Sequence, residues 1–174
     1  LNAVGFRSPS MYHNLELVHD LNIDYDASTF DTDPFEPQPD GVRTIFPFWV
    51  EENARQNGYV ELPYTLPQDF LLFILMGQSD INIWKKKIDW IAEHGGMALV
   101  ITHPDYMNFD GTAREYHKYP VTYYEKLLQY LKEKYDKQCW NVLPKDMARF
   151  WATTFSHEAR PKTKKKHICM LVYS

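Results

Sequence analysis

Short apolar runs alternate with amphipathic patterns along most of the chain, and this alternation predicts strands followed by helices. The predicted strands are residues 3–6, 23–28, 44–50, 59–62, 97–101, 139–143 and 168–173. The predicted helices are residues 11–21, 66–76, 81–94, 121–135 and 144–153. Repeated strand–helix order is typical of an α/β fold, so we expect that class, arranged as part of a barrel.

The clearest predicted unit is the helix and strand between residues 80 and 101. Its apolar residues recur at helical spacing: Ile81, Trp84, Ile88, Ile91 and Ala92. Asp80 is placed to cap the start of this helix, and Gly95 with Gly96 to end it. The continuously apolar segment 97–101 then predicts a strand covered on both faces, as in a parallel sheet.

Length and composition indicate one folded domain over residues 1–174. The order of the predicted elements makes 1–155 the barrel part and 156–174 a basic turn and closing strand. Aromatic residues make up 16% of the chain, which argues against disorder. The net charge of -4 argues against a general nucleic-acid binder. No apolar run approaches the ~20 residues of a membrane helix. Cys139 and Cys169 either bridge or stay reduced, which leaves the compartment open.

Reactive side chains stand at the ends of two predicted strands. His103 follows the strand 97–101, where an imidazole suits general acid or base work, and Asp105 is placed to hold its ring. Arg7 follows the strand 3–6 and can bind a carboxylate or an oxyanion. The alternatives are a loop histidine bonded to backbone and a surface arginine in an ion pair. The basic run 160–166 is interpreted as a solvated turn before an edge strand.

Several segments together resemble the polysaccharide deacetylases of the NodB homology type, which are carbohydrate esterases. Gly-Phe-Arg-Ser-Pro-Ser (5–10) resembles the third motif of that family, Arg-x-Pro and an aromatic, with Ser10 in place of the aromatic. Ala-Leu-Val-Ile-Thr-His-Pro-Asp-Tyr (98–106) resembles the fifth motif, an apolar strand ending in a catalytic histidine. Segments 23–28 and 124–151 resemble a further strand and the terminal helix, strand and helix. The resemblance covers most of residues 1–155.

The resemblance implies the C-terminal part of an irregular (β/α) barrel and a metal-dependent removal of N- or O-acetyl groups from a polysaccharide. In that scheme Arg7 orients the base carboxylate and His103 protonates the leaving group. Pro9, Asp105 and Tyr106 are the implied substrate-binding residues. The implied cofactor is a divalent metal, zinc by the family, whose ligands are not in this chain.

Two of the family's motifs are missing where the resemblance would need them. Thr-Phe-Asp-Asp and His-Ser/Thr-x-x-His should precede Arg7, but only six residues do. Thr-Phe-Asp-Thr-Asp (29–33) imitates the first motif and is interpreted as a coincidence. The family's fourth motif, an Asp/Trp segment, has no assigned position here.

Two hypotheses remain open. The favoured one is a part of a deacetylase that needs the N-terminal part of its barrel, or a partner chain, besides the carbohydrate. The alternative is a non-catalytic relative that binds glycans through an aromatic groove. The groove candidates are Tyr106, Phe109, Tyr116 and Tyr119.

Overall fold

The computed structural model describes residues 3–9, 13–32, 41–51, 58–111 and 116–155, and the backbone of 169–173. Its first sheet has the strand order β1-β2-β4-β3. The bounds are β1 (Gly5–Phe6), β2 (Tyr25–Asp26), β3 (Phe48–Glu51) and β4 (Gly58–Glu61). β1, β2 and β4 run parallel, and β3 pairs antiparallel to β4. The fold is therefore mixed α/β with a mixed sheet.

The second sheet is parallel and has the order β5-β9-β8. Its strands are β5 (Met97–Val100), β8 (Cys139–Val142) and β9 (Cys169–Tyr173). The predicted closing strand exists, but β9 pairs on both sides, with β5 and with β8. The prediction that the basic run leads into an edge strand is therefore wrong. The basic run 160–166 itself lies outside the described residues.

Thr65 joins the two sheets. Its backbone N–H donates to the Leu99 carbonyl at 3.0 Å, and its hydroxyl accepts from the Leu99 N–H at 3.0 Å and donates to the Met97 carbonyl at 2.8 Å. The chain after β4 therefore runs beside β5. The Asp69 N–H donates to the Ile101 carbonyl at 3.4 Å, so the two segments also end side by side.

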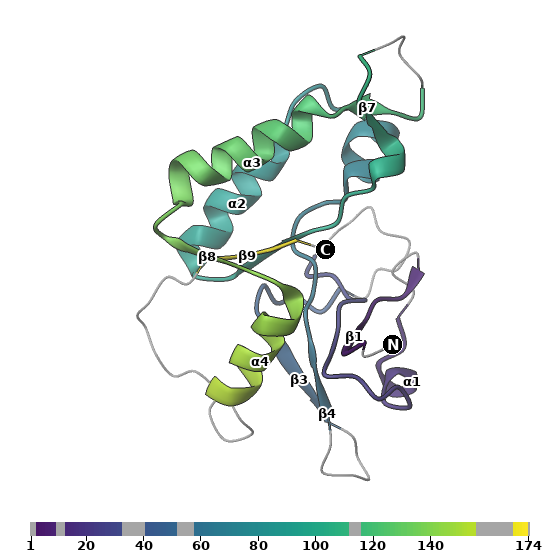
Figure 1. Cartoon of the computed structure of the whole chain (residues 1–174), viewed down its shortest axis with the longest axis vertical. Helices are drawn as coiled ribbons and strands as arrows, with labels where there is room; N and C mark the ends of the chain where they lie inside the picture. The colour runs from purple at the N-terminus through teal and green to yellow at the C-terminus, as the bar shows by residue number, and fades with distance from the viewer. Residues whose placement is uncertain are drawn as a thin grey trace.

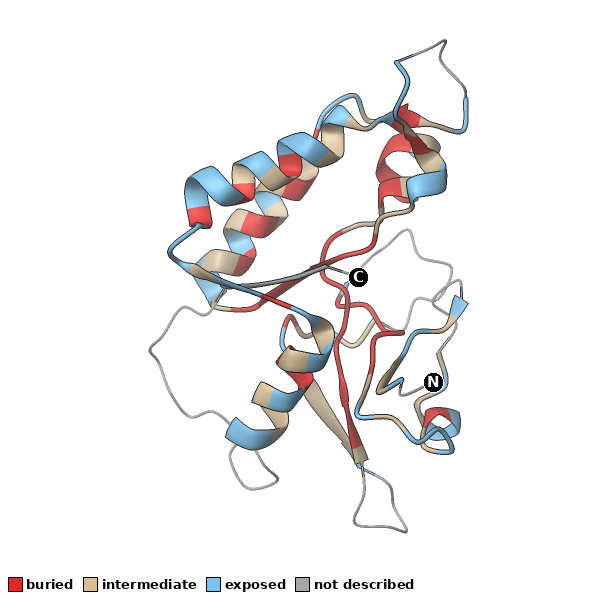
Figure 2. Cartoon of the chain, viewed as in Figure 1, coloured by how far each residue is buried: buried red, intermediate tan, exposed pale blue. Residues whose placement is uncertain are grey.

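Helices cover both faces of β5, as the apolar pattern of this strand predicts. Ala98 and Val100 belong to the core formed with α2 (Asn82–His94) and α3 (Thr122–Tyr135). Met97, Leu99 and Ile101 belong to the core formed with α4 (Pro144–Thr154). Figure 1 shows α2 and α3 side by side, away from α4. Figure 2 shows buried residues along the strands between them.

The C-terminal end of α2 follows the sequence prediction, whereas its N-cap is Ile81, one residue after the predicted Asp80. Asp80 Oδ1 accepts from the Asn82 N–H at 2.8 Å. Gly95 adopts a left-handed conformation with φ of 71°, and the Gly96 N–H donates to the Ile91 carbonyl at 3.1 Å. Glycine suits this position because a side chain strains a positive φ.

Three other elements begin four residues later than predicted. The helix expected over 11–21 is reduced to α1 (Leu15–Val18), capped by Asn14, whose Oδ1 accepts from Glu16 N–H and Leu17 N–H. The helix expected over 66–76 is the π-helix η2 (Phe70–Leu75). β3 starts at Phe48, not at residue 44. Ser10, the predicted cap, lies outside the described residues.

Within the described strands, β1 and β8 each have a partner on one side only. The two sheets therefore form an open arrangement in this part of the chain, and a closed barrel is not seen there. In the same residues, no helix has the length and apolar character needed to cross a bilayer.

Candidate functional site

His103 and Asp69 form a pair where two parallel segments end. His103 follows β5, and Asp69 follows the segment that Thr65 aligns beside it. The ring Nδ1 of His103 lies 2.7 Å from Asp69 Oδ1, and the His103 backbone N–H donates to Asp69 Oδ2 at 2.6 Å. The Asp69 side chain is 0% exposed and the His103 side chain 39%. One member is thus fixed inside the protein, while the other reaches solvent.

The Asp69 carboxylate accepts two more hydrogen bonds. The Phe70 N–H donates to Oδ1 at 2.8 Å, and the Tyr119 hydroxyl donates to Oδ2 at 2.9 Å. Tyr119 lies on β7 (Tyr119–Pro120), which pairs with β6 (Met107–Asn108). Burial and the neighbouring Asp69 raise the pKa of Tyr119, so its phenol keeps the proton that it donates. Four donors therefore surround this buried carboxylate.

This arrangement assigns the roles of the two ring nitrogens of His103. Because a carboxylate only accepts, Nδ1 carries the proton in the contact with Asp69. Nε2 makes no hydrogen bond within the described part of the chain, and it is the nitrogen left to meet a ligand. A buried carboxylate that orients an imidazole in this way is a common arrangement for proton transfer.

Tyr106 forms one wall beside His103. It ends the 3-10 helix η3 (Pro104–Tyr106), and its ring lies 5.3 Å from the His103 ring at 62° and 5.0 Å from the Phe70 ring. Asp105 is exposed in the same turn. Asp69, and not Asp105, accepts the hydrogen bond from the imidazole, so the prediction that Asp105 holds the ring is wrong. The substrate-binding roles of Tyr106 and Asp105 stay predictions.

Arg7 and Pro9 lie after β1, and both are exposed. Gly5 is opposite Tyr25 in the sheet, and a Cβ at Gly5 would overlap the Tyr25 ring. Although Arg7 is exposed, neighbouring atoms displace part of the water around its guanidinium, and this desolvation lowers the pKa of Arg7. The adjacent Tyr25 phenol acts in the opposite direction. Among the described residues no hydrogen bond or ion pair joins Arg7 to His103, so their shared site stays a prediction.

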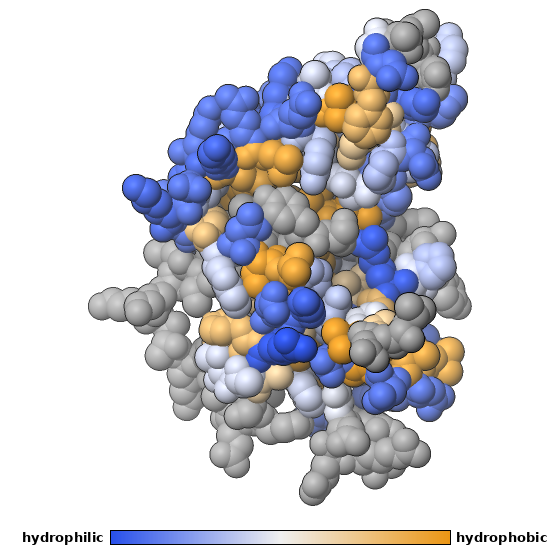
Figure 3. Space-filling model, in the orientation of Figure 1, coloured by the Kyte–Doolittle hydropathy of each residue, from blue (hydrophilic) through white to orange (hydrophobic). Residues whose placement is uncertain are grey.

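A cavity of about 610 Å³ opens beside η2, β6 and β7. Three of the four aromatic residues predicted for a groove line it, namely Phe109, Tyr116 and Tyr119, whereas Tyr106 does not. Tyr116 is fully exposed, but Tyr119 is buried. Figure 3 shows apolar side chains reaching the surface in this region. Tyr119 thus lines the cavity with its ring and contacts Asp69 with its hydroxyl.

The described residues do not supply a complete metal site. No group of three or more His, Cys, Asp or Glu side chains in this part of the chain is placed to hold an ion. Asp31, in the segment that imitates the first deacetylase motif, instead pairs with Lys87 at 2.5 Å. The residues present therefore do not fit the implied zinc ion by themselves, and we derive no step through it.

Sequence reasoning missed Asp69 and the role of Tyr119. Asp69 stands just before an apolar helical run, and the pattern placed it inside a helix beginning at residue 66. The available signal was an acidic residue after Pro67 in an otherwise apolar region. That signal identifies a partner for His103 only when the pairing of residues 62–69 with β5 is known.

Comparisons with protein-family models, with curated proteins and with solved structures found no match to this chain. We therefore infer function from the geometry of the described residues, and above all from the contact between the His103 ring and the buried Asp69.

Proposed function

We propose that this chain supplies the proton donor of a metal-dependent deacetylase that hydrolyses N- or O-acetyl groups on a polysaccharide. The observation that carries the proposal is the hydrogen bond between His103 Nδ1 and the buried Asp69 carboxylate. That bond fixes the ring and leaves Nε2 directed away from Asp69. The sequence resemblance to polysaccharide deacetylases gives the substrate class.

In the proposed reaction, water adds to the acetyl carbon. Protonated His103 then donates from Nε2 to the leaving nitrogen or oxygen of the sugar as the bond between that atom and the carbon breaks, which releases acetate. Asp69 stabilises the positive charge on the ring before the transfer and keeps the ring oriented after it. The partial exposure of His103 lets the ring regain a proton from solvent.

Arg7 and the metal complete the proposal. Arg7 orients the carboxylate of a general base, as the resemblance implies, and Pro9 gives its turn a fixed backbone angle. The base and the ligands of the divalent metal, zinc by the family, lie outside the described residues. They would come from another segment of the protein or from a partner chain.

We further propose that the two sheets are part of an irregular (β/α) barrel. Support comes from the parallel pairing within β1-β2-β4 and within β5-β9-β8, and from helices on both faces of β5. The outer sides of β1 and β8 have no partner in the described strands, and they are suited to pairing with further strands.

The test measures acetate release by the protein encoded in the whole reading frame that contains this chain. The substrates are N-acetylglucosamine oligomers and O-acetylated xylan. We expect His103→Ala to lower kcat by about 10²- to 10⁴-fold, the usual loss of a general acid. His94→Ala is the matched control, since His94 is an exposed histidine stacked on Trp90.

Equal turnover by the wild type and by His103→Ala contradicts the acid role. An equal loss in His94→Ala contradicts it as well, because a histidine far from the site would then matter as much. Folding of each variant is checked by circular dichroism before the rates are compared.

A second candidate function is glycan binding without catalysis. The observation that favours it is the cavity lined by Phe109, Tyr116 and Tyr119, because exposed aromatic faces are typical contacts for sugar rings. Tyr116 is the best probe of this function, since it is fully exposed and its removal leaves the core intact.

The second function is tested by titrating the same protein with unacetylated oligosaccharides in a calorimeter. Under this alternative, Tyr116→Ala weakens binding by about tenfold, the effect of one lost aromatic contact. The wild type then binds sugar without releasing acetate. Binding together with acetate release favours the deacetylase.

A further inference from the structure

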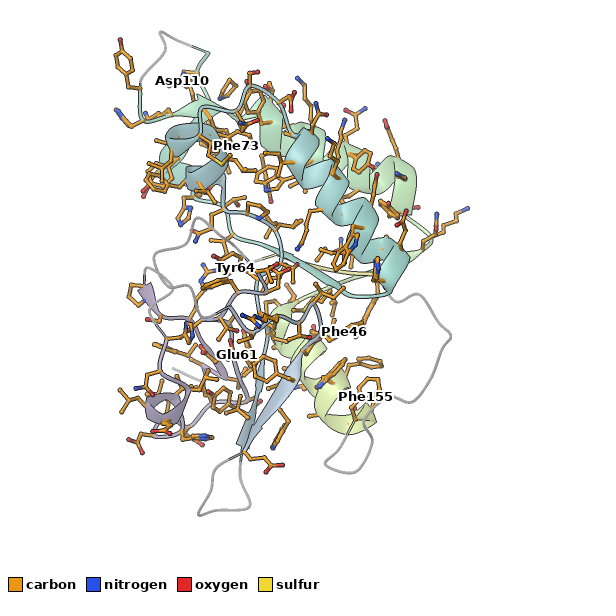
Figure 4. All side chains as sticks on the ribbon, turned by 180° about the vertical axis from the view of Figure 1, so that it is seen from behind. Phe46, Glu61, Tyr64, Phe73, Asp110 and Phe155 are labelled. Atoms are coloured by element: carbon orange, nitrogen blue, oxygen red, sulfur yellow. The ribbon has the colours of Figure 1, made fainter. Side chains whose placement is uncertain are left out.

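Two buried acidic residues face each other on neighbouring strands, in a part of the fold remote in sequence from His103. Asp26 ends β2 and Glu61 ends β4, and the two are direct partners in the parallel register. Both are 0% exposed. Figure 4 shows Glu61 in the lower half of the molecule, away from Phe73 on η2.

Each acid uses one oxygen to accept hydrogen bonds from side chains that follow β2. Asp26 Oδ1 accepts from the Ser28 hydroxyl at 2.7 Å. Glu61 Oε1 accepts from the Thr29 hydroxyl at 2.6 Å and from the Thr29 N–H at 3.0 Å. These donors hold each side chain in place through one of its two carboxyl oxygens.

The two remaining oxygens have no donor from the protein in the described residues. Because Asp26 and Glu61 are direct partners in the register, their side chains lie next to each other on one face of the sheet, where a hydrogen bond can join them. Two acceptors make such a bond only when one of them carries a proton. Burial and the charge of Asp26 raise the pKa of Glu61 to about 8, which agrees with a proton held between them at neutral pH.

Among the residues that the structure describes, the groups around the pair do not supply another charge to neutralise it. Tyr59 lies on the same face of β4 and hydrogen-bonds the Leu15 carbonyl at 3.1 Å. Burial and the two acids raise the pKa of Tyr59, so it stays neutral. His19 packs edge-on against Tyr59 at 5.2 Å. Arg7 follows β1, and its charge interacts with the Tyr25 phenol rather than with either acid.

The remaining neighbouring elements are apolar where they meet these strands. β3 places Phe48 opposite Glu61. α4 packs in the core formed by Val60 and Leu62, the residues on either side of Glu61, whose side chains point to the other face of the strand. Its buried residues there are Met147 and Ala148.

A chain of hydrogen bonds leads from the pair to the turn that carries Arg7. The Ser28 hydroxyl donates to Asp26 and accepts from the Ser8 N–H at 2.8 Å. The Ala27 N–H donates to the Phe6 carbonyl at 3.0 Å. The residues on both sides of Arg7 are therefore tied to the strand that bears Asp26.

We propose that Asp26 and Glu61 share one proton and that this protonated pair positions the Arg7 turn through Ser28. The two acids are positioning residues, since neither reaches solvent. A role of the Arg7 turn in catalysis rests on the proposed function. The sharing of a proton by Asp26 and Glu61 is independent of that function.

The pH dependence follows from the direction of the shift in Glu61. Its folded pKa lies above the ordinary value, so the folded state holds the proton more tightly than the unfolded state between those two values. The pair contributes its full stability below the ordinary value of about 4.5. That contribution falls as the pH rises and is lost above about 8, where both acids are charged.

The test uses the whole chain and two measurements that need no enzymatic activity. Carboxyl ¹³C NMR of wild-type protein follows the ionisation of the two side chains directly. Hydrogen exchange of the Ser8 amide, corrected for its intrinsic pH dependence, follows the turn. We expect one proton to leave the pair near pH 8 and the protection of Ser8 to fall by about tenfold from pH 6 to pH 9.

Glu61→Gln is the informative variant, because its amide donates permanently to Asp26 while its oxygen still accepts from Thr29. We expect Ser8 protection to become independent of pH in this variant. Glu93→Gln, an exposed site on α2, and His19→Gln are the controls and keep the wild-type profile.

Two outcomes overturn the proposal. In one, both carboxyls of the wild type ionise below pH 6, which means that no proton is shared. In the other, the proton is shared but Ser8 protection does not follow its loss, which removes the positioning role. If Glu61→Gln does not fold, the two wild-type measurements still decide the question. Acetate release has no part in either readout, so failure of the deacetylase proposal is a separate result.

Discussion

Two sites in this protein contain buried carboxyl groups, and the groups that stabilise them differ between the two sites. Asp69 accepts hydrogen bonds from four donors, two of them backbone N–H groups. Asp26 and Glu61 receive donors on one oxygen each, and within the described residues no donor reaches their other oxygens. Hydrogen-bond donors surround the Asp69 carboxylate. The Asp26–Glu61 pair lacks one donor and holds a proton instead.

The comparison shows that burial alone does not decide the chemistry of an acid. Both sites are closed to solvent, yet only the Asp69 site has a partner, His103, that reaches the surface. That exposure makes the His103–Asp69 pair suitable for proton transfer to a ligand. The Asp26–Glu61 pair is suitable only for holding the fold around it.

The largest expected difference in the free energy of unfolding comes from replacing aspartate by asparagine at each of the two sites. Asp69→Asn brings an amide donor against groups that already donate, and we expect it to lower the free energy of unfolding by about 3 kcal/mol. Asp26→Asn supplies the donor that its pair needs and should change the unfolding free energy by less than about 1 kcal/mol at pH 7. Urea denaturation measures both. Equal losses at the two sites would remove the distinction between them.

The second effect concerns Ser28, which serves two partners at once. Ser28→Ala leaves the Ser8 N–H without its acceptor and Asp26 without its hydroxyl donor. We expect the free energy of unfolding to fall by about 2 kcal/mol, the cost of unsatisfied buried groups. Ser8→Ala keeps the backbone N–H and is the matched control in the same denaturation series. If Ser28→Ala is as stable as the wild type, the hydrogen bonds through Ser28 do not hold the Arg7 turn in place.

A smaller effect is expected at Tyr119, where one of four donors is removed. Tyr119→Phe deletes the hydroxyl that donates to Asp69, and we expect a loss of about 1 kcal/mol in thermal or urea unfolding. Tyr123→Phe is the matched control, because its ring stacks on Tyr119 and also lines the cavity. The prediction fails if the two variants lose the same stability.

The smallest effect is expected at Asp105. Because Asp69 holds the imidazole and Asp105 is exposed, Asp105→Ala should change the unfolding free energy by less than about 0.5 kcal/mol. The NMR signals of the His103 ring should also keep their positions. A clear shift of those signals would mean that Asp105 does contact the His103 ring.

Much of the local structure was predictable because it depends on short-range patterns. The apolar face of α2 and its glycine end were confirmed, as were the strands β5 and β8 and the helices α3 and α4 within a residue or two. His103 was correctly placed at the end of β5. These elements have strong periodicity or clear ends, which a single stretch of sequence contains.

The shorter elements were predicted less well. In α1, the cap is Asn14, and the helix has only four residues, too few for periodicity to define its start. Thr65 carries no strand pattern, yet its hydroxyl takes part in the pairing with β5. A side chain that substitutes for a backbone partner leaves no signal in the alternation of apolar and polar positions.

By itself the sequence determined the α/β class, the amphipathic helices, the buried strand before His103 and the presence of Arg7 after the first strand. The tertiary structure decided which acids meet which partners: Asp69 with His103 across 34 positions, and Glu61 with Thr29 across 32. It also placed β9 between β5 and β8. The physical reason is that turns and helices follow from neighbouring residues, whereas the surroundings of a buried charge depend on how distant strands align.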